Sequence, residues 1–362
     1  MIMLRVRNRR SLLLLVAILI LNGCNSRLQE QDFFITSLTV LDPCQAKEID
    51  LNKSFTTTAI VPMSTIVDSL IISIDRSHKP FMYTVSNIQS DSLLGTFCRR
   101  GRSNNEVLDC LPIMDTFKNT DGDLCTTVFS FGDGRLFIWN ITQSLASEND
   151  VYEKIVQLRN KENWFPFFSG YYQNDTSVVV RNSKQVGAIA AICDVPRYEV
   201  YNTDNGELID SYNIFKQVQF ETKNPVYSVQ SFYGCIDCVK PDRTKIAMGM
   251  GYMPVYGILD LYSGEFKGFK IKDYLPFSPY ERIWHFCSMA ADNHLIYALY
   301  YGGDITPYTS RGASTLIVFD WDGQIKSKYE LNKYVTQIGL SDNMLYLSHT
   351  DQTVYILDTR EL

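Results

Sequence analysis

The sequence predicts an all-β protein, a six-bladed β-propeller that is closed by an N-terminal strand. The chain is rich in aromatic residues, with 22 Tyr, 20 Phe and 4 Trp among 362 residues, and strands favour such side chains. Short apolar strands that end in Asn or Asp recur, and three of them run into a glycine turn and another strand. Such hairpin signals, repeated in units of about 40–60 residues, are typical of propeller blades.

The period of these strands sets the number of blades. The strands end at Asn140, Asn202, Asp260, Asp320 and Asp358. Polar turns at Asp242, Asp292 and Asp342, which lie 50 residues apart, each precede a further strand. The spacing predicts blades near residues 57–97, 107–158, 165–213, 226–271, 283–331 and 335–362. A β-sandwich or two smaller β-domains would be the alternative arrangement of so many short strands.

The last blade lacks one strand, because only four residues follow Val354–Asp358. The segment Phe33–Phe55 is the one spare β-prone stretch, so we expect it to supply the missing outer strand. Closure of this kind also removes an open sheet edge. No linker rich in Pro, Gly or Ser divides the rest of the chain, and residues 33–362 are therefore expected to form one domain.

The first 24 residues predict export. A basic region precedes an apolar run of ten residues, Leu12–Leu21, which is too short to span a bilayer as a permanent helix. The run ends in Leu21-Asn22-Gly23-Cys24, which has the form of a bacterial lipobox. In such a sequence the small Gly23 suits the lipoprotein signal peptidase, and the Cys24 thiol carries the lipid. We therefore expect a signal peptide over residues 1–23 and a lipid tether over residues 24–32. The basic region consists of Arg5, Arg7, Arg9 and Arg10.

Lipidation at Cys24 would place the protein in the bacterial cell envelope. A thioether-linked diacylglycerol together with an N-acyl chain such as palmitate exceeds the two-chain threshold for stable membrane anchoring. We expect the outer membrane rather than the inner one, with a periplasmic or surface-exposed body. The alternatives are an ordinary cleaved signal followed by a structural cysteine, and an uncleaved anchor.

The mature chain would be acidic. The formal net charge is −6, and removal of the signal with its four arginines takes it to −10. The Lys and Arg residues are scattered along the sequence, whereas a nucleic-acid-binding protein needs a basic face. These features exclude nucleic acid as a partner. Because no second apolar run near 18 residues follows the signal, we expect the remainder to be a water-soluble body.

The segment of residues 63–106 is similar to the first blade of the TolB-like six-bladed propeller lipoproteins of Bacteroidetes. In that family the stretch after the fourth strand typically has the pattern G-x-F-G-x-x-G-x-G-P-x-E-F. Four residues match the pattern: Gly95, Phe97, Gly101 and Glu106. Four depart from it: Cys98, Ser103, Asn104 and Val107. The resemblance implies a propeller on a lipid tether, and it implies no settled activity.

Sequence signatures of catalysis are missing. The four histidines have no metal-ligand spacing, and the chain contains no HExxH, GxSxG, Walker loop or dinucleotide fingerprint. The stretch Phe131–Gly134 resembles part of a calcium loop, but Asp-Gly is also an expected hairpin turn. No cofactor is therefore expected. Six-bladed lactonases hold calcium on the channel axis with ligands from separate blades, so a calcium-dependent hydrolase or lactonase-like enzyme stays open as the alternative.

Eight cysteines besides Cys24 could form disulfides in an exported chain. The one close pair is Cys235 and Cys238, which lies in a hairpin region and not at the helix N-terminus that a thioredoxin-like site needs. A zinc ribbon would require a second CxxC, which is missing. We expect a local disulfide or two buried thiols here, ahead of a metal site or redox catalysis.

These features favour a binding or protein-interaction module of unknown ligand over an enzyme. Loops from every blade surround the channel of a propeller, which suits recognition of a glycan, a peptide or a partner protein. A solvated turn between blades is the alternative role for the loop candidates, and core packing is the alternative for the aromatic stretch Trp164–Phe168. The candidate binding residues are Arg99, Arg100, Arg102, Asn104, Asn105, Glu106 and Trp164.

Overall fold

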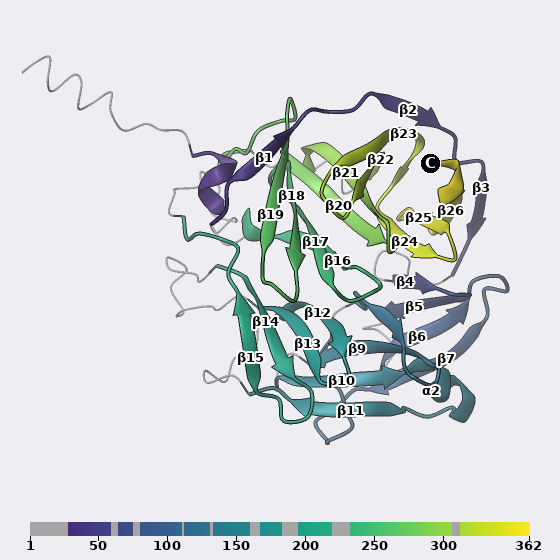
Figure 1. Cartoon of the computed structure of the whole chain (residues 1–362). Coiled ribbons are helices and arrows are strands. Elements are labelled where there is room, and N and C mark those ends of the chain that lie inside the picture. The colour runs from purple at the N-terminus through teal and green to yellow at the C-terminus, as the bar shows by residue number, and fades with distance from the viewer. Residues whose placement is uncertain are drawn as a thin grey trace, which may run out of the picture.

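A computed structural model of the protein consists of six β-sheets in a ring, and each sheet is one blade of a propeller (Figure 1). In each blade four strands pair antiparallel, and the first of them lies nearest the axis. The structure describes residues 28–58, 64–74, 80–110, 112–130, 133–159, 167–182, 195–218, 232–281, 283–305 and 312–362.

The first three blades are built from consecutive chain segments. Blade 1 comprises β4 (Ser64–Val67), β5 (Leu70–Ile74), β6 (Phe81–Asn87) and β7 (Leu93–Arg99). Blade 2 comprises β8 (Thr116–Lys118), β9 (Leu124–Ser130), β10 (Arg135–Asn140), the helix α2 (Ile141–Ser147) and β11 (Tyr152–Gln157). Blade 3 comprises β12 (Phe167–Asn174), β13 (Ser177–Asn182), β14 (Arg197–Asn202) and β15 (Leu208–Tyr212).

The other three blades include strands from both ends of the described chain. Blade 4 contains β16 (Cys235–Val239), β17 (Lys245–Met250), β18 (Val255–Asp260) and β19 (Phe266–Ile271). Blade 5 contains β20 (Ile283–Ala291), β21 (Leu295–Asp304), β22 (Ala313–Asp320) and β23 (Ile325–Val335). Blade 6 contains β24 (Gln337–Ser341), β25 (Met344–Ser348) and β26 (Thr353–Asp358), which the short 3-10 helix η4 (Thr359–Glu361) follows.

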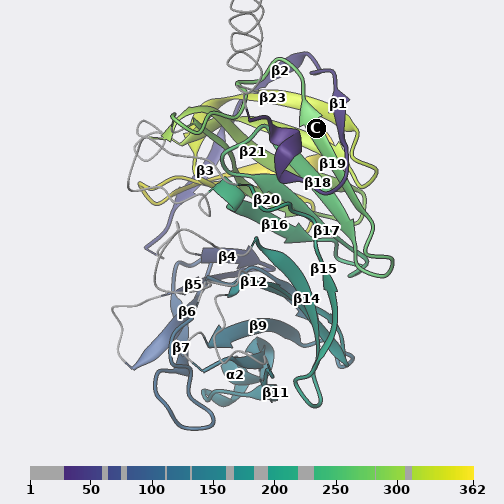
Figure 2. The ribbon, with the colours of Figure 1, turned by 90° about the vertical axis from the view of Figure 1, so that its left-hand side faces the viewer.

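The N-terminal segment of residues 30–56, here called the strap, runs along the outer edges of blades 4 to 6 (Figure 2). It begins with the 3-10 helix η1 (Glu30–Phe33). Strand β1 (Leu38–Leu41) adds parallel to β19, and β2 (Ala46–Ile49) adds parallel to β23. Strand β3 (Lys53–Thr56) pairs antiparallel with β26 and completes blade 6. The predicted closure is therefore confirmed, while the two additional strands β1 and β2 were not expected.

Aromatic side chains fill the space between neighbouring sheets. The ring of Trp139 in blade 2 contacts Tyr83 and Phe97 of blade 1, with centroid distances of 5.6 and 5.7 Å. Between blades 4 and 5, the rings of Tyr256 and Phe319 lie 4.0 Å apart. All five side chains are buried. Large rings contribute much of the stability of a protein core. The packing of one sheet against the next therefore explains the high aromatic content of the sequence.

Aspartates form the turns that follow the innermost strands. The carboxylate of Asp292 accepts the amides of His294 and Leu295, each at 2.7 Å, and Asp242 accepts the amide of Thr244 at 3.0 Å. Asp242, Asp292 and Asp342 therefore recur at 50-residue spacing because each blade needs such a turn.

The six-bladed propeller predicted from the sequence is confirmed, and the β-sandwich alternative is wrong. The ends of the blades and the starts of blades 3, 5 and 6 agree closely with the expected limits, whereas blades 1, 2 and 4 begin seven to nine residues later than expected, at Ser64, Thr116 and Cys235. Among the described residues, Leu28 already packs against the core, and the side chain of Glu30 is buried. Residues 1–27 lie outside the described residues. Over the part of the chain that the structure describes, no helix is long and apolar enough to cross a membrane.

Candidate functional site

The loop that contains most of the predicted binding residues follows β7 and is fixed by hydrogen bonds. At its start, the amides of Cys98 and Arg99 donate to the carboxylate of Asp150 at 2.7 and 2.9 Å. Two backbone bonds then close the loop, because the Gly101 amide donates to Val107 and the Val107 amide donates to Arg99. The loop therefore holds a fixed shape through its own backbone.

The residues that match the family pattern stabilise this part of the chain. A Cβ at Gly95 would lie 2.6 Å from the ring of Phe97, and a Cβ at Gly101 would lie 1.9 Å from Oε2 of Glu106. The same Oε2 accepts the Ser103 amide at 3.0 Å, and this bond lowers the pKa of the Glu106 carboxyl. The two glycines thus leave room for the phenylalanine ring and for the carboxylate.

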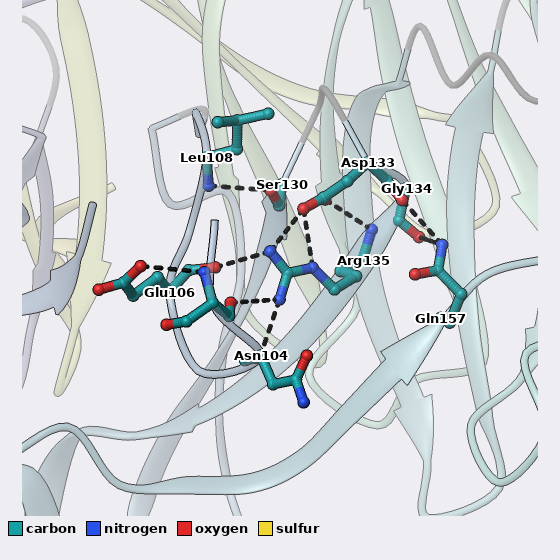
Figure 3. A network of polar contacts seen from close by, with 9 residues as sticks. Asn104, Glu106, Leu108, Ser130, Asp133, Gly134, Arg135 and Gln157 are labelled. Atoms are coloured by element: carbon teal, nitrogen blue, oxygen red, sulfur yellow. Dashed lines mark hydrogen bonds and ion pairs between the residues drawn. The ribbon is translucent and has the colours of Figure 1, made fainter. Parts of the chain in front are cut away.

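Arg135 of blade 2 holds the far side of the same loop (Figure 3). Its side chain is only 11% exposed and forms hydrogen bonds with the Asp133 carboxylate, including one at 2.8 Å from Nε. The guanidinium also donates to the carbonyl oxygens of Ser103, Asn104 and Glu106, at 2.8 to 2.9 Å. The sequence analysis missed Arg135, and the single signal for it was the Asp-Gly turn just before β10.

The structure separates the predicted binding residues into two groups. Glu106 is half-buried, and its carboxylate serves the loop, which agrees with the alternative of a structural turn for this residue. Trp164 lies outside the described residues. The remaining candidates are exposed on the loop surface: Arg99, Arg100, Arg102, Asn104 and Asn105.

A second candidate site lies on the propeller axis, where the innermost strands surround a cavity of about 270 Å³. Five blades contribute to its wall, which is largely made of small and polar side chains. Since these residues come from separate blades, no local sequence pattern could reveal the cavity. Its polar lining includes Ser64, Thr65, Asp115, Thr116, Asp237, Ser288, Gln337 and Ser348.

The first charged group of the cavity is Asp115, just before β8. Nη1 of Arg243, from the turn after β16, lies 2.5 Å from Oδ1 of Asp115, and Nη2 donates to the carbonyl of Thr116 at 2.7 Å. The Tyr172 amide of blade 3 donates to Oδ2 at 3.1 Å. Burial raises the pKa of Asp115, and Arg243 opposes that rise. This carboxylate therefore connects blades 2, 3 and 4 at the channel.

The second charged group is Asp237 of β16, which is also buried. Its Oδ2 lies 3.3 Å from Nε of Arg181 and accepts the Ser169 hydroxyl at 2.8 Å. Charged residues inside strands are a signal that could have indicated this site, because burial of a charge requires a partner. Each channel aspartate is thus neutralised by one arginine.

Gln337 contributes a buried hydrogen-bond acceptor to the cavity wall. Its Nε2 donates to the carbonyl of Ser64, whereas its Oε1 is buried and has no protein partner among the described residues. A buried acceptor of this kind calls for a water or a ligand. The described aspartates of the cavity are therefore paired, and its wall also carries hydroxyl side chains that can form hydrogen bonds.

The close cysteine pair is two buried thiols. Cys235 and Cys238 are both free, 6% and 7% exposed, and three residues apart on one strand. Side chains at odd spacing on a strand point to opposite faces, which explains why they form no local disulfide. Burial raises the pKa of both thiols well above the usual range, so neither has the low pKa of a redox thiol. Cys24 and Cys193 lie outside the described residues.

The histidines show no sign of a metal site where the structure describes them. His285 is fully buried, its Nδ1 lies 2.9 Å from the Tyr300 hydroxyl, and burial lowers its pKa to about 3. His294 and His349 lie at exposed or half-buried turns, and His78 lies outside the described residues. Across the described ranges, no three His, Cys, Asp or Glu side chains are grouped to hold a metal ion.

Comparisons with known proteins support the fold and no particular function. No protein-family model and no curated protein matches the chain. A member of the DUF4221 family from Bacteroides vulgatus has a TM-score of 0.57 and 11% sequence identity, covering 84% of this chain and 95% of that one. Identity this low shows the β-propeller fold alone, so the resemblance to TolB-like lipoproteins stays a prediction.

Two further solved structures resemble the chain with TM-scores below 0.5, and these do not inform the function of this protein. The Swd1 propeller domain from Myceliophteria thermophila has a TM-score of 0.42 and 10% identity, covering 84% of this chain and 99% of that one. BamB from Moraxella catarrhalis has a TM-score of 0.37 and 11% identity, covering 80% of this chain and 82% of that one.

Proposed function

We propose that the protein is a lipid-anchored binding module of the bacterial cell envelope, held by Cys24 to the outer membrane with a periplasmic or surface-exposed body. Its propeller receives a small polar ligand, or the polar end of a glycan or protein partner, in the axial cavity. The observation that carries the binding role is this cavity, because residues from five blades converge on it.

The chemistry of the cavity favours a neutral, hydroxyl-rich ligand. The two aspartates are paired with Arg243 and Arg181. Their carboxylates and the two guanidinium groups are therefore not available to pair with a charged ligand. Hydroxyl side chains of the wall offer hydrogen bonds of the kind that a sugar can use. The volume of about 270 Å³ lies just under the range of about 300–1,000 Å³ that drug-sized ligands occupy. A single sugar unit at the end of a glycan suits these limits.

A cavity-filling variant tests the site. A Cβ at Gly339 would meet nothing nearer than 3.6 Å, so Gly339→Leu should fill the channel without breaking the sheet. Ligand binding raises the melting temperature by mass action. We expect at least one member of a panel of monosaccharides to raise the Tm of the wild type and of the control Ser54→Leu, but not of Gly339→Leu. If free amino acids raise the Tm and sugars do not, the ligand class is wrong; if Gly339→Leu keeps the shift, the site is wrong.

Lipid attachment is tested separately. Because the thioether would form on the Cys24 sulfur, Cys24→Ser should remove the protein from the membrane fraction and abolish labelling with a fatty acid. Labelling that is unchanged in the variant would contradict the anchor.

The calcium-dependent enzyme fits the channel less well. A calcium ion needs six to eight oxygen ligands, with carboxylates among them, whereas both described channel aspartates already bind arginine side chains. The binding module is therefore the function that the geometry supports best.

A further inference from the structure

The N-terminal strap is fixed to blade 4 by a buried charge. Glu30 is 3% exposed. Its Oε2 lies 2.9 Å from Nζ of Lys270 on β19, and its Oε1 accepts the Phe277 amide at 2.7 Å. Burial tends to raise the pKa of Glu30, but the Phe277 amide and Lys270 outweigh it and lower the pKa. The carboxylate is therefore ionised and held at two atoms.

Two aromatic side chains strengthen this attachment. Phe33 and Phe34 lie three and four residues after Glu30 and are fully buried. The ring of Phe33 lies 4.9 Å from that of Phe277, and the ring of Phe34 lies 5.3 Å from that of Phe215. The strap is thus part of the packed body from Glu30 onward.

The attachment limits how far blade 4 can lie from the lipid. Only five residues lie between Cys24 and Glu30, and an extended chain spans at most about 3.3–3.6 Å for each of the six steps, or roughly 20 Å in all. Because Glu30 cannot leave blade 4 without breaking its ion pair, the blade 4 rim must stay within this distance of the acyl chains.

Exposed apolar side chains gather along the chain around the same point. Ile35 is 50% exposed and lies five residues from Glu30, and its amide donates to Ile214. Leu275 and Tyr280 are 49% and 59% exposed, and they lie on either side of Phe277, whose amide Glu30 accepts. Large apolar and tyrosine side chains of this kind enter the interfacial layer of a bilayer.

From the short reach and the apolar rim together, we infer that Ile35, Leu275 and Tyr280 rest on the membrane surface, so the propeller is held in one orientation and does not swing freely on its anchor. The inference rests on the lipid attachment at Cys24 proposed above. The partner of this surface is a lipid bilayer, because the short tether keeps the bilayer close to this rim. The charged side chain of Lys272 at this rim pairs with Asp42, so the contact depends on apolar side chains and not on lipid charge.

Fluorescence quenching by brominated lipid tests the orientation. Full-length, acylated protein is reconstituted into phosphatidylcholine vesicles with and without bromine on the acyl chains. Leu275→Trp is compared with Leu93→Trp, which lies on β7 across the ring from η1 and is 62% exposed (Figure 1). Wild-type emission is subtracted, and an unchanged Tm shows that each variant folds. We expect brominated lipid to quench the emission added at position 275 and to leave that added at position 93 unchanged.

Each other outcome has a distinct meaning. Equal quenching at both positions, or no quenching at position 275 in vesicle-bound protein, overturns the orientation and leaves the anchor in place. If the protein carries no acyl chain by mass spectrometry and does not float with the vesicles, the proposed anchor itself fails. Equal results in neutral and anionic vesicles support the apolar contact, and quenching that needs anionic lipid contradicts it.

Discussion

Blades 4 to 6 and blades 1 to 3 are the same four-stranded unit with different outer edges. In blades 4 and 5 the strap adds a fifth strand outside the sheet, and in blade 6 it supplies the fourth. In the described part of blades 1 to 3, the outermost strands β7, β11 and β15 have no further strand beside them. Half of the ring is therefore tied together by one continuous segment, whereas the blades of the other half are joined by packing between sheets and by side-chain hydrogen bonds such as those of Asp150 and Asp115.

The open edges share one irregularity with a covered edge. The register between each of β7, β11 and β15 and its neighbour is broken by a β-bulge, and the same kind of break occurs between β22 and the covered strand β23. Their exposed apolar residues are Leu93, Leu94, Ile155, Leu208 and Ile209. The comparison shows that the strap, and not the bulge, distinguishes the two halves of the ring.

Deletion of Phe33–Phe55 should have the largest effect on this arrangement. The deletion removes two buried aromatic rings and all or most of three strands, and loss of one such ring alone costs about 3–5 kcal/mol. The net stability of a domain is only about 5–15 kcal/mol, so we expect the whole ring to lose its cooperative thermal transition. Deletion of residues 25–27 is the control, because Leu28 already packs against the core. A melting temperature that stays unchanged would mean that the strap is a tether only.

Removal of the Glu30 carboxylate should loosen the strap without unfolding the ring. Glu30→Ala leaves the Phe277 amide without its partner, which costs about 1–3 kcal/mol. Because the folded-state pKa of Glu30 is lowered, its contribution is present above the unfolded-state pKa and is lost as the pH falls through the folded-state pKa. Wild-type stability should therefore fall more steeply below about pH 4.3 than that of Glu30→Gln. Identical pH profiles in urea titrations would contradict this role.

Arg135 offers a matching test in the uncovered half. Arg135→Met removes three charge-assisted hydrogen bonds to the loop of residues 103–106. A hydrogen bond to a charged group contributes about 1.5–3 kcal/mol to stability. We expect faster proteolysis within this loop and a lower Tm. Arg100→Met, at an exposed position of the same loop, should change neither. Equal protection of the loop in both variants would show that the backbone alone maintains its shape.

Removal of divalent ions should have the smallest effect. Since both described channel aspartates pair with arginines, dialysis against EDTA should leave the Tm unchanged. A fall that added calcium reverses would establish an axial ion by mass action and would favour the hydrolase over the binding module.

The fold could be predicted because its strands and turns recur along the chain. The site could not be predicted because its residues lie far apart in the sequence. Strand ends such as Asp260 and Asp320 recur because every blade needs the same turn, so the blades and their closure could be predicted. The strap strands β1 and β2 pair with residues more than 200 positions away, and short strands without a local partner carry no pairing signal. The ion pair of Asp115 and Arg243 joins blades 2 and 4, a contact that neither residue type predicts alone.

Hydrogen exchange of the full-length protein tests most directly whether the strap stabilises one half of the ring. The outer strands β19 and β23 are covered by β1 and β2, so their amides should exchange slowly. The amides of β7, β11 and β15 that face away from their single neighbour should exchange faster under the same conditions, apart from those of Cys98 and Arg99, which donate to Asp150. In Glu30→Ala the difference should shrink through faster exchange in β1 and β19, with blades 1 to 3 unchanged. Equal protection of covered and uncovered outer strands in the wild type would contradict the account.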